Sequence, residues 1–357
     1  MTAPELRPTS LPAPQVPDPL AGPSLRWAIL GTGWIADRFV EALQQNTNQR
    51  VVAVGSRTLP RAEEFASARG IPEAYGSYVD LVAADVDVVY VATGHLDHLA
   101  HATLALEAGK PVLVEKPMTP RLADTRALVA LARAKGLFAM EAVWTLALPR
   151  YSVVRQVIES GMLGEIHEVY ANLGERLIDH HRAMDPAQGG GAINDIGSYT
   201  MMFANEMLRD LSVQAAHGTR GPRSGADGAG AVDATEPAIA QFHALLGNDE
   251  GQIATVSASM FGDTPTTAYI AGSEATLALE APFYQPGPVT VRFHDGEVLR
   301  YDEPALAHSQ LFWEALEVAR CIDAGLTESP LRPLERTLET VALMEQAREL
   351  MGDPLGR

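Results

Sequence analysis

Three segments of this sequence combine residue types that could carry out chemistry on a small molecule. A lysine in one segment could donate a hydrogen bond to a substrate oxygen, and a tyrosine in another could exchange a proton with a carbonyl or an alcohol. Glycines in the remaining segment could let a phosphate approach the backbone. In chain order the segments are GTGWIA (31–36), EKP (115–117) and GGGAINDIGSY (189–199).

The first segment has the form of a dinucleotide-binding loop. Gly31 and Gly33 follow an apolar run and open an amphipathic segment, which is where glycines let a pyrophosphate reach a helix N-terminus. Trp34 and Ile35, in the first helical turn, are predicted to contact the cofactor with them. The alternative interpretation is a tight turn without a ligand.

The end of the second predicted strand bears on which dinucleotide binds. An NAD-specific fold usually has an acidic residue there for the ribose hydroxyls, but this chain has Ser56 and Arg57, with Arg61 nearby. A hydroxyl and guanidinium groups suit a 2′-phosphate, so NADP is favoured and NAD remains possible. Alternatively, both arginines are solvated charges at a helix start.

The other two segments could supply the reacting groups. Lys116 and Glu115 end a predicted strand at the sheet edge where doubly wound folds bind ligands, and both are candidates for contact with the cofactor. Asp195 and Tyr199 are four residues apart, hence on one face of a helix that Asp195 could cap. Alternatives are a surface lysine, a plain N-cap and a core tyrosine.

The spacing of apolar residues predicts the elements that position these groups. Residues 25–147 alternate short apolar runs with amphipathic segments, which indicates a Rossmann-type, doubly wound parallel sheet. The expected strands and helices of this domain are 27–30, 51–55, 86–92, 111–115 and 137–142, and 34–45, 60–69, 98–108 and 122–135.

Residues 148–357 predict a substrate-binding and oligomerisation domain of α+β class with a large, open, mostly antiparallel sheet. We expect its C-terminal helices to be able to pack on the first domain, and a glycine-rich loop at 218–230. The expected strands are 165–175, 212–218, 239–246, 252–260, 266–271 and 275–280, and the expected helices are 150–159, 309–324 and 334–351.

Composition excludes several classes of protein. The net charge of -18 repels a nucleic-acid backbone. Cys321 is the only cysteine, no apolar stretch is long enough to span a bilayer, and the N-terminus lacks signal-peptide character, so we expect a cytoplasmic protein. Residues 1–24 contain seven prolines and predict a flexible or surface-draped tail.

Taken together, the motifs resemble those of the Gfo/Idh/MocA superfamily, the glucose-fructose oxidoreductase and inositol dehydrogenase type. The resemblance covers about residues 26–350 and is strongest for the branch of dimeric dihydrodiol dehydrogenase and xylose dehydrogenase. It is carried by five segments in the family's order: GTGWIA, SRTLPRAEEFA, AGKPVLVEKP, MEAVWTLALPRY and GGGAINDIGSY.

The resemblance implies a role for each motif residue. Lys116 would contact substrate and nicotinamide, often after a cis peptide at Pro117. Tyr199 would be the general acid/base, Asp195 would help to hold the substrate, and Trp144 would lie near the cofactor. Of the family's strand-end sequence TPNxxH, this chain keeps Thr93 and His98 as further cofactor-binding candidates.

Three departures from the family pattern alter the expected polarity of the pocket. Gly94 and His95 replace a Pro-Asn pair, Leu146 stands where close relatives have arginine, and Asn194 replaces a leucine. Of the predicted properties, the substrate is therefore the one that the resemblance defines least.

The resulting hypothesis is an NAD(P)-dependent, NADP-preferring dehydrogenase or reductase. It would transfer hydride between nicotinamide and a secondary alcohol or hemiacetal carbon of a sugar, polyol or cyclic diol, as a homodimer or homotetramer. The rivals are a dinucleotide-binding sensor or repressor, and an enzyme that recycles a tightly bound cofactor in sugar dismutation or glycoside cleavage. No metal is expected, although Asp179, His180, His181 and Asp185 form a cluster of ligand-type side chains.

Overall fold

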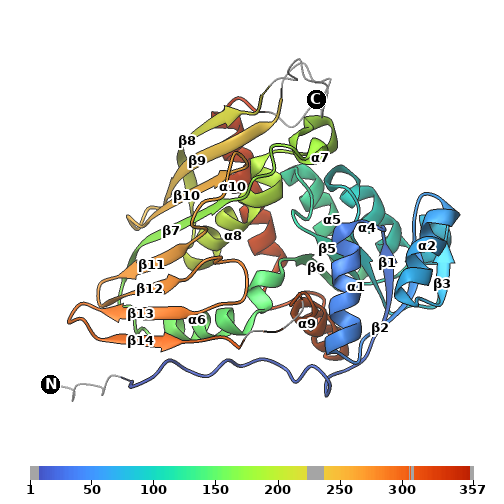
Figure 1. Ribbon diagram of the computed structural model, residues 1–357, viewed down its shortest axis with the longest axis horizontal. Coiled ribbons are helices and arrows are strands. Elements are labelled where there is room, and N and C mark those ends of the chain that lie inside the picture. The colour runs from blue at the N-terminus through green and yellow to red at the C-terminus, as the bar shows by residue number, and fades with distance from the viewer. Residues whose placement is uncertain (1–7, 223–236, 305, 307–308, 354–357) are drawn as a thin grey trace.

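The N-terminal half of the chain is a six-stranded parallel sheet with helices on both faces (Figure 1). The computed structural model describes residues 8–222, 237–304, 306 and 309–353. The strand order β3-β2-β1-β4-β5-β6 is that of a doubly wound Rossmann sheet. The strands are β1 (Arg26–Leu30), β2 (Arg50–Gly55), β3 (Glu73–Tyr75), β4 (Val88–Val91), β5 (Val112–Glu115) and β6 (Ala139–Ala142).

Both faces of this sheet are buried, which explains why its central strands β1, β4 and β5 are almost continuous apolar runs. Val89, Val91 and Val114 pack in one apolar cluster, and Ile29, Tyr90 and Leu113 pack on the opposite face in another, which continues into the second half of the chain. The covering helices are α1 (Trp34–Asn46), α2 (Leu59–Arg69), α3 (Tyr78–Val82), α4 (His98–Glu107) and α5 (Leu122–Lys135).

The carboxyl ends of the parallel strands bring the predicted cofactor and catalytic segments to one edge. Gly31 follows β1, Ser56 follows β2 and Lys116 follows β5. Thr93 lies two residues beyond β4, and Trp144 opens a short 3₁₀ turn after β6. Because parallel strands all point the same way, these residues share the edge at which such sheets bind ligands.

The second half contains an eight-stranded sheet in which every pairing is antiparallel except that of β7 with β10. The strand order is β14-β13-β12-β11-β7-β10-β9-β8. The strands are β7 (Ile166–Gly174), β8 (Ser212–Arg220), β9 (Ile239–Gly247), β10 (Ile253–Ser259), β11 (Ala268–Gly272), β12 (Ala275–Leu279), β13 (Val289–Phe293) and β14 (Val298–Tyr301).

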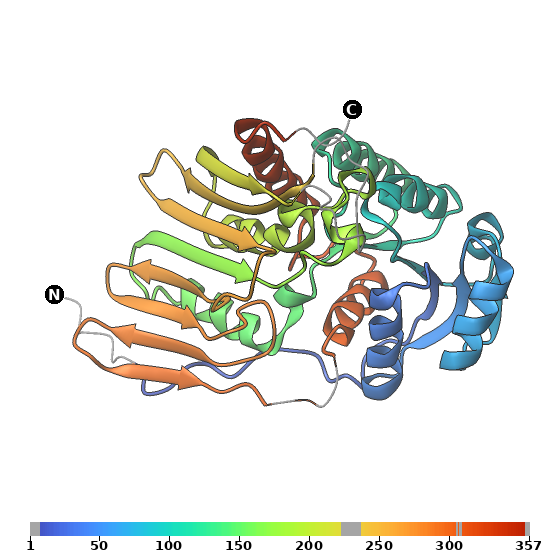
Figure 2. The ribbon, with the colours of Figure 1, turned by 45° about the horizontal axis from the view of Figure 1, so that its top comes forward.

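Helices cover one face of this sheet and leave the other open (Figure 2). Helix α8 packs on β7 and β10, and α10 packs on β8. The two C-terminal helices also reach the first half of the chain, since α9 contacts α1 and α10 contacts α5. The helices of this half are α6 (Pro149–Glu159), α7 (His181–Met184), α8 (Ser198–Met207), α9 (Phe312–Asp323) and α10 (Leu334–Leu350).

The observed elements confirm the predicted fold class and add short elements to it. β3, α3, β13 and β14 were not predicted, because each has five residues or fewer, which is too short for a clear periodic pattern. β8 runs to Arg220 and so includes the first three residues of the predicted glycine-rich loop, of which residues 223–230 lie outside the described part of the chain.

Residues 8–24 run along the surface of both halves (Figure 1). Leu11 is buried, and the main-chain N–H of Gln15 donates to Ser152 Oγ at 2.8 Å. Gln156 donates to the carbonyl of Ala13 at 3.0 Å. This part of the proline-rich segment is therefore held against α6 by side-chain hydrogen bonds.

Candidate functional site

The loop after β1 has the geometry of a pyrophosphate cradle. Gly31 has a φ of 117°, and a Cβ there would lie 2.6 Å from the carbonyl oxygen of Ala92, so only glycine fits. Gly33 is the N-cap of α1 and supplies no side-chain cap to the first amides of the helix. Those amides and the helix dipole are available to an anion, so the loop fits a dinucleotide. Trp34 beside it is largely exposed, whereas Ile35 packs against the core.

Ser56 and Arg61 lie beside this loop. Arg61 Nε donates to Thr32 Oγ1 at 3.1 Å, and Thr32 Oγ1 lies 3.4 Å from Ser56 Oγ. Arg57 is exposed at the same corner. Hydroxyl and guanidinium groups thus gather at the end of β2, where an NAD-specific sheet would present a carboxylate.

Thr93 and His98 hold the end of β4 to the turn after β5. His98 is fully buried, and its ring nitrogens face the carbonyl oxygens of Pro117 at 3.0 Å and Thr93 at 3.2 Å. Thr93 Oγ1 lies 2.9 Å from Nδ1 of His101. The contacts of His98 are therefore with main chain, which gives it a positioning role at this edge.

Lys116, Tyr199, Trp144 and Asp195 come together from three segments of the chain. The ammonium of Lys116 lies 4.7 Å from the centre of the Tyr199 ring and donates to the main-chain carbonyl of Asp195. Trp144 Nε1 donates to the Tyr199 hydroxyl at 3.1 Å. The peptide between Lys116 and Pro117 is cis, as the family resemblance implies. The two predicted proton-handling residues thus face each other.

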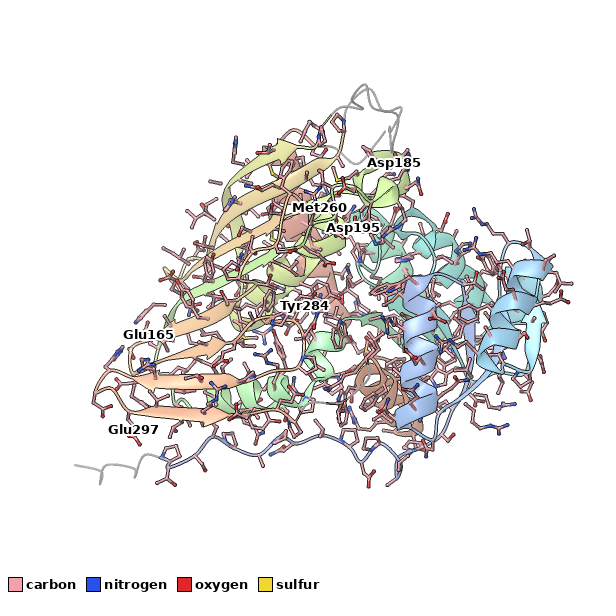
Figure 3. The ribbon with its side chains drawn as sticks, in the orientation of Figure 1. Glu165, Asp185, Asp195, Met260, Tyr284 and Glu297 are labelled. Carbon is pink, nitrogen blue, oxygen red and sulfur yellow. The ribbon has the colours of Figure 1, made fainter. Side chains whose placement is uncertain are left out.

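Asp195 does not cap a helix as predicted. It lies within a π-helical turn, Ile193–Gly197, that runs directly into α8, so its carboxylate is not needed at a helix start. Instead, Asp195 Oδ1 pairs with Arg182 at 3.2 Å, while Oδ2 is buried without a hydrogen-bond partner in the described structure. That oxygen remains available to a ligand hydroxyl (Figure 3, which labels Asp195).

Burial shifts both predicted reacting groups toward their neutral forms. It lowers the pKa of Lys116, although the charges of Asp195 and Glu115 oppose the shift. It raises the pKa of Tyr199 well above the ordinary value, and the charge of Glu115 adds to this. Tyr199 therefore holds its proton at neutral pH, which suits a proton donor.

Glu115, predicted to contact the cofactor, directs its carboxylate to neighbours within the chain. Oε1 accepts from the hydroxyl of Tyr90 at 2.5 Å and Oε2 from the main-chain N–H of Lys116 at 3.0 Å. Burial raises its pKa. In this geometry Glu115 binds the main chain of Lys116 and the hydroxyl of Tyr90.

Tyr284 is a site residue that the sequence analysis missed. Its ring packs at 4.8 Å from that of Tyr199 and edge-on to Trp144, and its carbonyl accepts from Thr145 at 2.8 Å. It belongs to the segment between β12 and β13 and lies at the border with the Rossmann half (Figure 3). Its side chain completes an aromatic wall with Trp144 and Tyr199.

A buried arginine holds the Tyr284 segment in place. The guanidinium of Arg150 donates to four main-chain carbonyls at 3.1 Å or less, those of Glu280, Pro282, Gln285 and Pro288. Such a clamp joins residues more than 120 positions apart in the sequence, which motif reasoning cannot see. The available signal was the pair Phe283-Tyr284 in a proline-rich stretch.

The three departures from the family pattern have different consequences. Leu146 is buried and leaves the site without an arginine at that position. His95 is buried, lies 3.2 Å from the carbonyl of Gly189 through Nδ1, and has a pKa well below its usual value because of burial. Asn194 is buried, and its side-chain amide donates to the carbonyl of Gly189 and accepts from Arg348.

The ligand-type cluster before the glycine run is divided among local contacts. Asp179 pairs with Arg176 at 2.7 Å, and Asp185 accepts from the main chain of Ala187 at 2.9 Å. Within residues 8–222, 237–304, 306 and 309–353, three ligand-type side chains nowhere meet in a way that could hold a metal. In the same part of the chain, no helix has the length and apolar character needed to cross a membrane.

Comparison with known proteins identifies the family. A model of the oxidoreductase family with an NAD-binding Rossmann fold matches residues 25–142, and the GFO/IDH/MocA C-terminal domain matches residues 151–278. The chain belongs to the Gfo/Idh/MocA family of oxidoreductases. It is accordingly an NAD(P)-binding enzyme of the dehydrogenase and reductase type.

Named relatives cover nearly the whole chain. Trans-1,2-dihydrobenzene-1,2-diol dehydrogenase of Bos taurus is 34% identical over 342 residues, which are 92% of this chain and 97% of the relative. The enzyme of the same name from Homo sapiens is 33% identical over 345 residues, with the same shares of the two chains.

Solved structures agree with these relatives. A 3-ketoreductase from Actinomadura kijaniata in complex with NADP and TDP-benzene superposes with a TM-score of 0.76 at 27% identity, covering 91% of this chain and 97% of that one. Levoglucosan dehydrogenase in complex with NADH and levoglucosan has a TM-score of 0.81 at 16% identity, covering 92% and 97%, and shows the shared fold.

Proposed function

We propose that this oxidoreductase catalyses reversible hydride transfer between NADP and a carbon bearing a secondary alcohol or hemiacetal of a sugar, polyol or cyclic diol. The observation that carries the proposal is the contact of Lys116 with Tyr199 at the carboxyl edge of the Rossmann sheet. The nicotinamide, when bound, supplies or accepts the hydride.

Tyr199 is the proposed proton donor and acceptor. Because burial keeps its hydroxyl protonated, it can give a proton to a carbonyl oxygen during reduction. Lys116 would donate a hydrogen bond to the same oxygen, and its positive charge would favour the tyrosinate needed for oxidation. The hydrogen bond from Trp144 holds the phenol in place and also favours its anion.

Asp195, Trp144 and Tyr284 would define the substrate. The Oδ2 atom of Asp195, which has no hydrogen-bond partner in the described structure, can accept a hydrogen bond from a hydroxyl group next to the reacting carbon. The aromatic rings of Trp144 and Tyr284 offer apolar faces against which the C–H groups of a ring can pack. This combination of one acceptor and an aromatic wall fits a small cyclic polyol or diol.

Preference for NADP is proposed from the end of β2. Ser56, Arg57 and Arg61 offer a hydroxyl and two cations where a 2′-phosphate would lie. The relatives include dihydrodiol dehydrogenases and a ketoreductase whose structure contains NADP. The double variant Arg57→Ala/Arg61→Ala is expected to weaken NADPH binding at least tenfold while changing NADH binding little. Equal losses for both cofactors would contradict the assignment.

A titration with NADPH and NADH, followed by a panel of aldoses, polyols and dihydrodiols, tests the function. We expect steady formation of free NADPH with at least one substrate. Tyr199→Phe should then reduce kcat by about 10² to 10⁴ while NADPH still binds. An unchanged kcat in that variant would refute the role of Tyr199, and bound cofactor without net NADPH release would favour internal recycling.

The open face of the eight-stranded sheet supports a homodimer or homotetramer, because an uncovered sheet of this size favours association with a second copy. Light scattering of the purified protein measures this directly. A mass that stays monomeric across concentrations would contradict it.

A further inference from the structure

A buried ion pair lies below the candidate site. Glu141, in β6, and Arg332, in the turn before α10, are both almost fully buried. Arg332 donates to Glu141 Oε2 through Nε at 3.1 Å and Nη2 at 2.7 Å. Its other terminal nitrogen donates to Glu206 of α8 at 2.6 Å. This arginine therefore joins the Rossmann sheet to the helix that carries Tyr199.

Glu141 also grips the turn that carries Lys116. Its Oε1 accepts from the main-chain N–H of Met118 at 2.9 Å, two residues after the lysine. Lys116, Tyr199, Glu141 and Arg332 line one cavity. The ion pair thus touches the catalytic turn by a hydrogen bond and borders the same cavity as the lysine.

Several charged or titratable groups surround the ammonium of Lys116. Negative charge comes from Asp195, Glu115 and Glu141, and positive charge from Arg182. His95, neutral because burial lowers its pKa, lies within range of the lysine charge, and Tyr199 lies under the ammonium. Of the three carboxylates, Glu141 is the one whose charge Arg332 offsets directly.

We propose that Arg332 is a positioning residue of the site, which acts on Lys116 by compensating the charge of Glu141 and holding that carboxylate against Met118. The proposal rests on the proposed function only for its catalytic consequence. The proposal itself concerns the protonation of Lys116. A Glu141 charge without Arg332 would favour the charged form of Lys116, and a neutral residue at position 141 would favour its neutral form.

The lowered pKa of Lys116 is consistent with this arrangement. Burial is its main cause, and the charge of Glu141 is one of the influences that oppose it. Arg332 itself remains charged, because the attraction of Glu141 and Glu206 outweighs its burial and raises its pKa. A permanent cation therefore screens Glu141 at every pH at which the enzyme is folded.

The chain has three lysines, Lys110, Lys116 and Lys135, so the protonation of each can be followed separately. Acetic anhydride acylates only the neutral amine, and peptide mass spectrometry after brief pulses at a series of pH values gives a midpoint for each lysine. Lys110 bonds the carbonyl of Val86 and Lys135 pairs with Glu107, so both serve as internal references.

Replacing Arg332 and replacing Glu141 should shift the Lys116 midpoint in opposite directions. Arg332→Met should raise the Lys116 midpoint by about half to one unit, and Glu141→Gln should lower it by a similar amount. Arg332→Lys keeps the charge and should leave the midpoint in place, and so should the double variant Glu141→Gln/Arg332→Met. If Arg332→Met does not fold, the difference between Glu141→Gln and the double variant measures the same effect.

A matched control is available on α9. Arg320 pairs with the buried Glu317 at 2.7 Å, and Arg320→Met leaves a buried carboxylate without its arginine away from the cavity. This variant should lose stability without moving the Lys116 midpoint. A Lys116 shift of equal size in the control, or shifts of the same sign in Arg332→Met and Glu141→Gln, would overturn the proposal.

Turnover provides a second readout. With a confirmed substrate, the pH profile of kcat for alcohol oxidation should move to higher pH in Arg332→Met and to lower pH in Glu141→Gln. The labelling experiment needs no substrate, so a protein that transfers no hydride would refute the proposed function and still report on Arg332. Conversely, normal turnover with an unmoved Lys116 midpoint would refute only the role of Arg332.

Discussion

Two neighbouring glutamates accept hydrogen bonds from the turn that carries Lys116, but their surroundings differ. Glu115 ends β5 and Glu141 lies in β6, where Glu115 pairs with Ala142 and Glu141 pairs with Val114. Glu115 accepts the main-chain N–H of Lys116 at 3.0 Å, and Glu141 accepts that of Met118 at 2.9 Å. Both carboxylates are buried, so each must be neutralised or solvated by its surroundings.

The partners of the two carboxylates are opposite in kind. Glu141 has a guanidinium, Arg332, and the hydroxyl of Thr337. Glu115 has the phenol of Tyr90 and the charge of a second buried glutamate, Glu314, neither of whose oxygens has a hydrogen-bond partner in the described part of the chain.

The difference shows two ways of stabilising a buried carboxyl group next to the candidate site. An arginine compensates Glu141 at every accessible pH, whereas Glu115 and Glu314 depend on a proton. Burial, and then the charge of Glu115, raise the pKa of Glu314 well above its ordinary value. Glu314 is the member that holds the proton, because Glu115 has two donors for its charge and Glu314 has none.

The largest expected effect comes from the residue that both glutamates position. Lys116→Met should lower kcat by about 10² to 10⁴, because it removes the cation beside Tyr199 and the donor to the substrate oxygen. Stopped-flow measurement of the hydride-transfer step with saturating NADP checks this. Lys135→Met, on the surface of α5, is the control that should retain full activity.

A stability measurement distinguishes the loss of activity predicted for Lys116→Met from a folding defect. The thermal midpoint of Lys116→Met should equal or exceed that of the wild type, since a buried ammonium is costly to desolvate. A large loss of stability together with the loss of activity would show that Lys116 is mainly a structural residue.

The two glutamates should respond to the same substitution with stability losses of different size. Glu141→Gln leaves Arg332 facing an amide and should cost about 3–5 kcal/mol of unfolding free energy. Glu115→Gln removes the repulsion between two buried carboxyls and should cost less than about 1 kcal/mol, or stabilise. Urea unfolding at pH 7 gives both values, and similar losses in the two variants would remove the distinction between them.

Much of the Rossmann half followed from the sequence because its helices are long and locally periodic. The helix 122–135 was predicted with the bounds that α5 has. Short elements were missed, and β13 and β14 are examples: Val289–Phe293 and Val298–Tyr301 have five and four residues, too few for a clear periodic pattern, and pair with each other at the edge of the sheet.

The candidate site was also predicted only in part. Lys116, Tyr199, Asp195 and Trp144 were found through motifs, and the structure brings them together. Tyr284 and Arg332 were not found, since contacts with segments more than 120 residues away give them their place. The cap predicted for Asp195 failed because a π-helical turn joins the glycine run to α8 without a break.

The last prediction concerns Glu314, whose effect on stability has a characteristic pH dependence. Because the folded pKa of this carboxyl is raised above the unfolded value, the folded state binds the proton more tightly, and stability falls as pH rises from the unfolded pKa to the folded one. Glu314→Gln removes this dependence. Its stability relative to the wild type should rise with pH, by about 1.4 kcal/mol for each unit of pKa difference.

Thermal unfolding of the wild type and Glu314→Gln at pH 4.5, 6 and 8 separates a proton effect from simple packing. The two proteins should differ least at pH 4.5, where both carry a neutral group at position 314, and most at pH 8. Glu303→Gln is a control of the same type, since burial raises the pKa of Glu303 to about 6 and its pH window should close earlier. A constant difference between wild type and Glu314→Gln at all three pH values would mean that the Glu115–Glu314 pair holds no extra proton, and that the two glutamates under the catalytic turn are solvated alike.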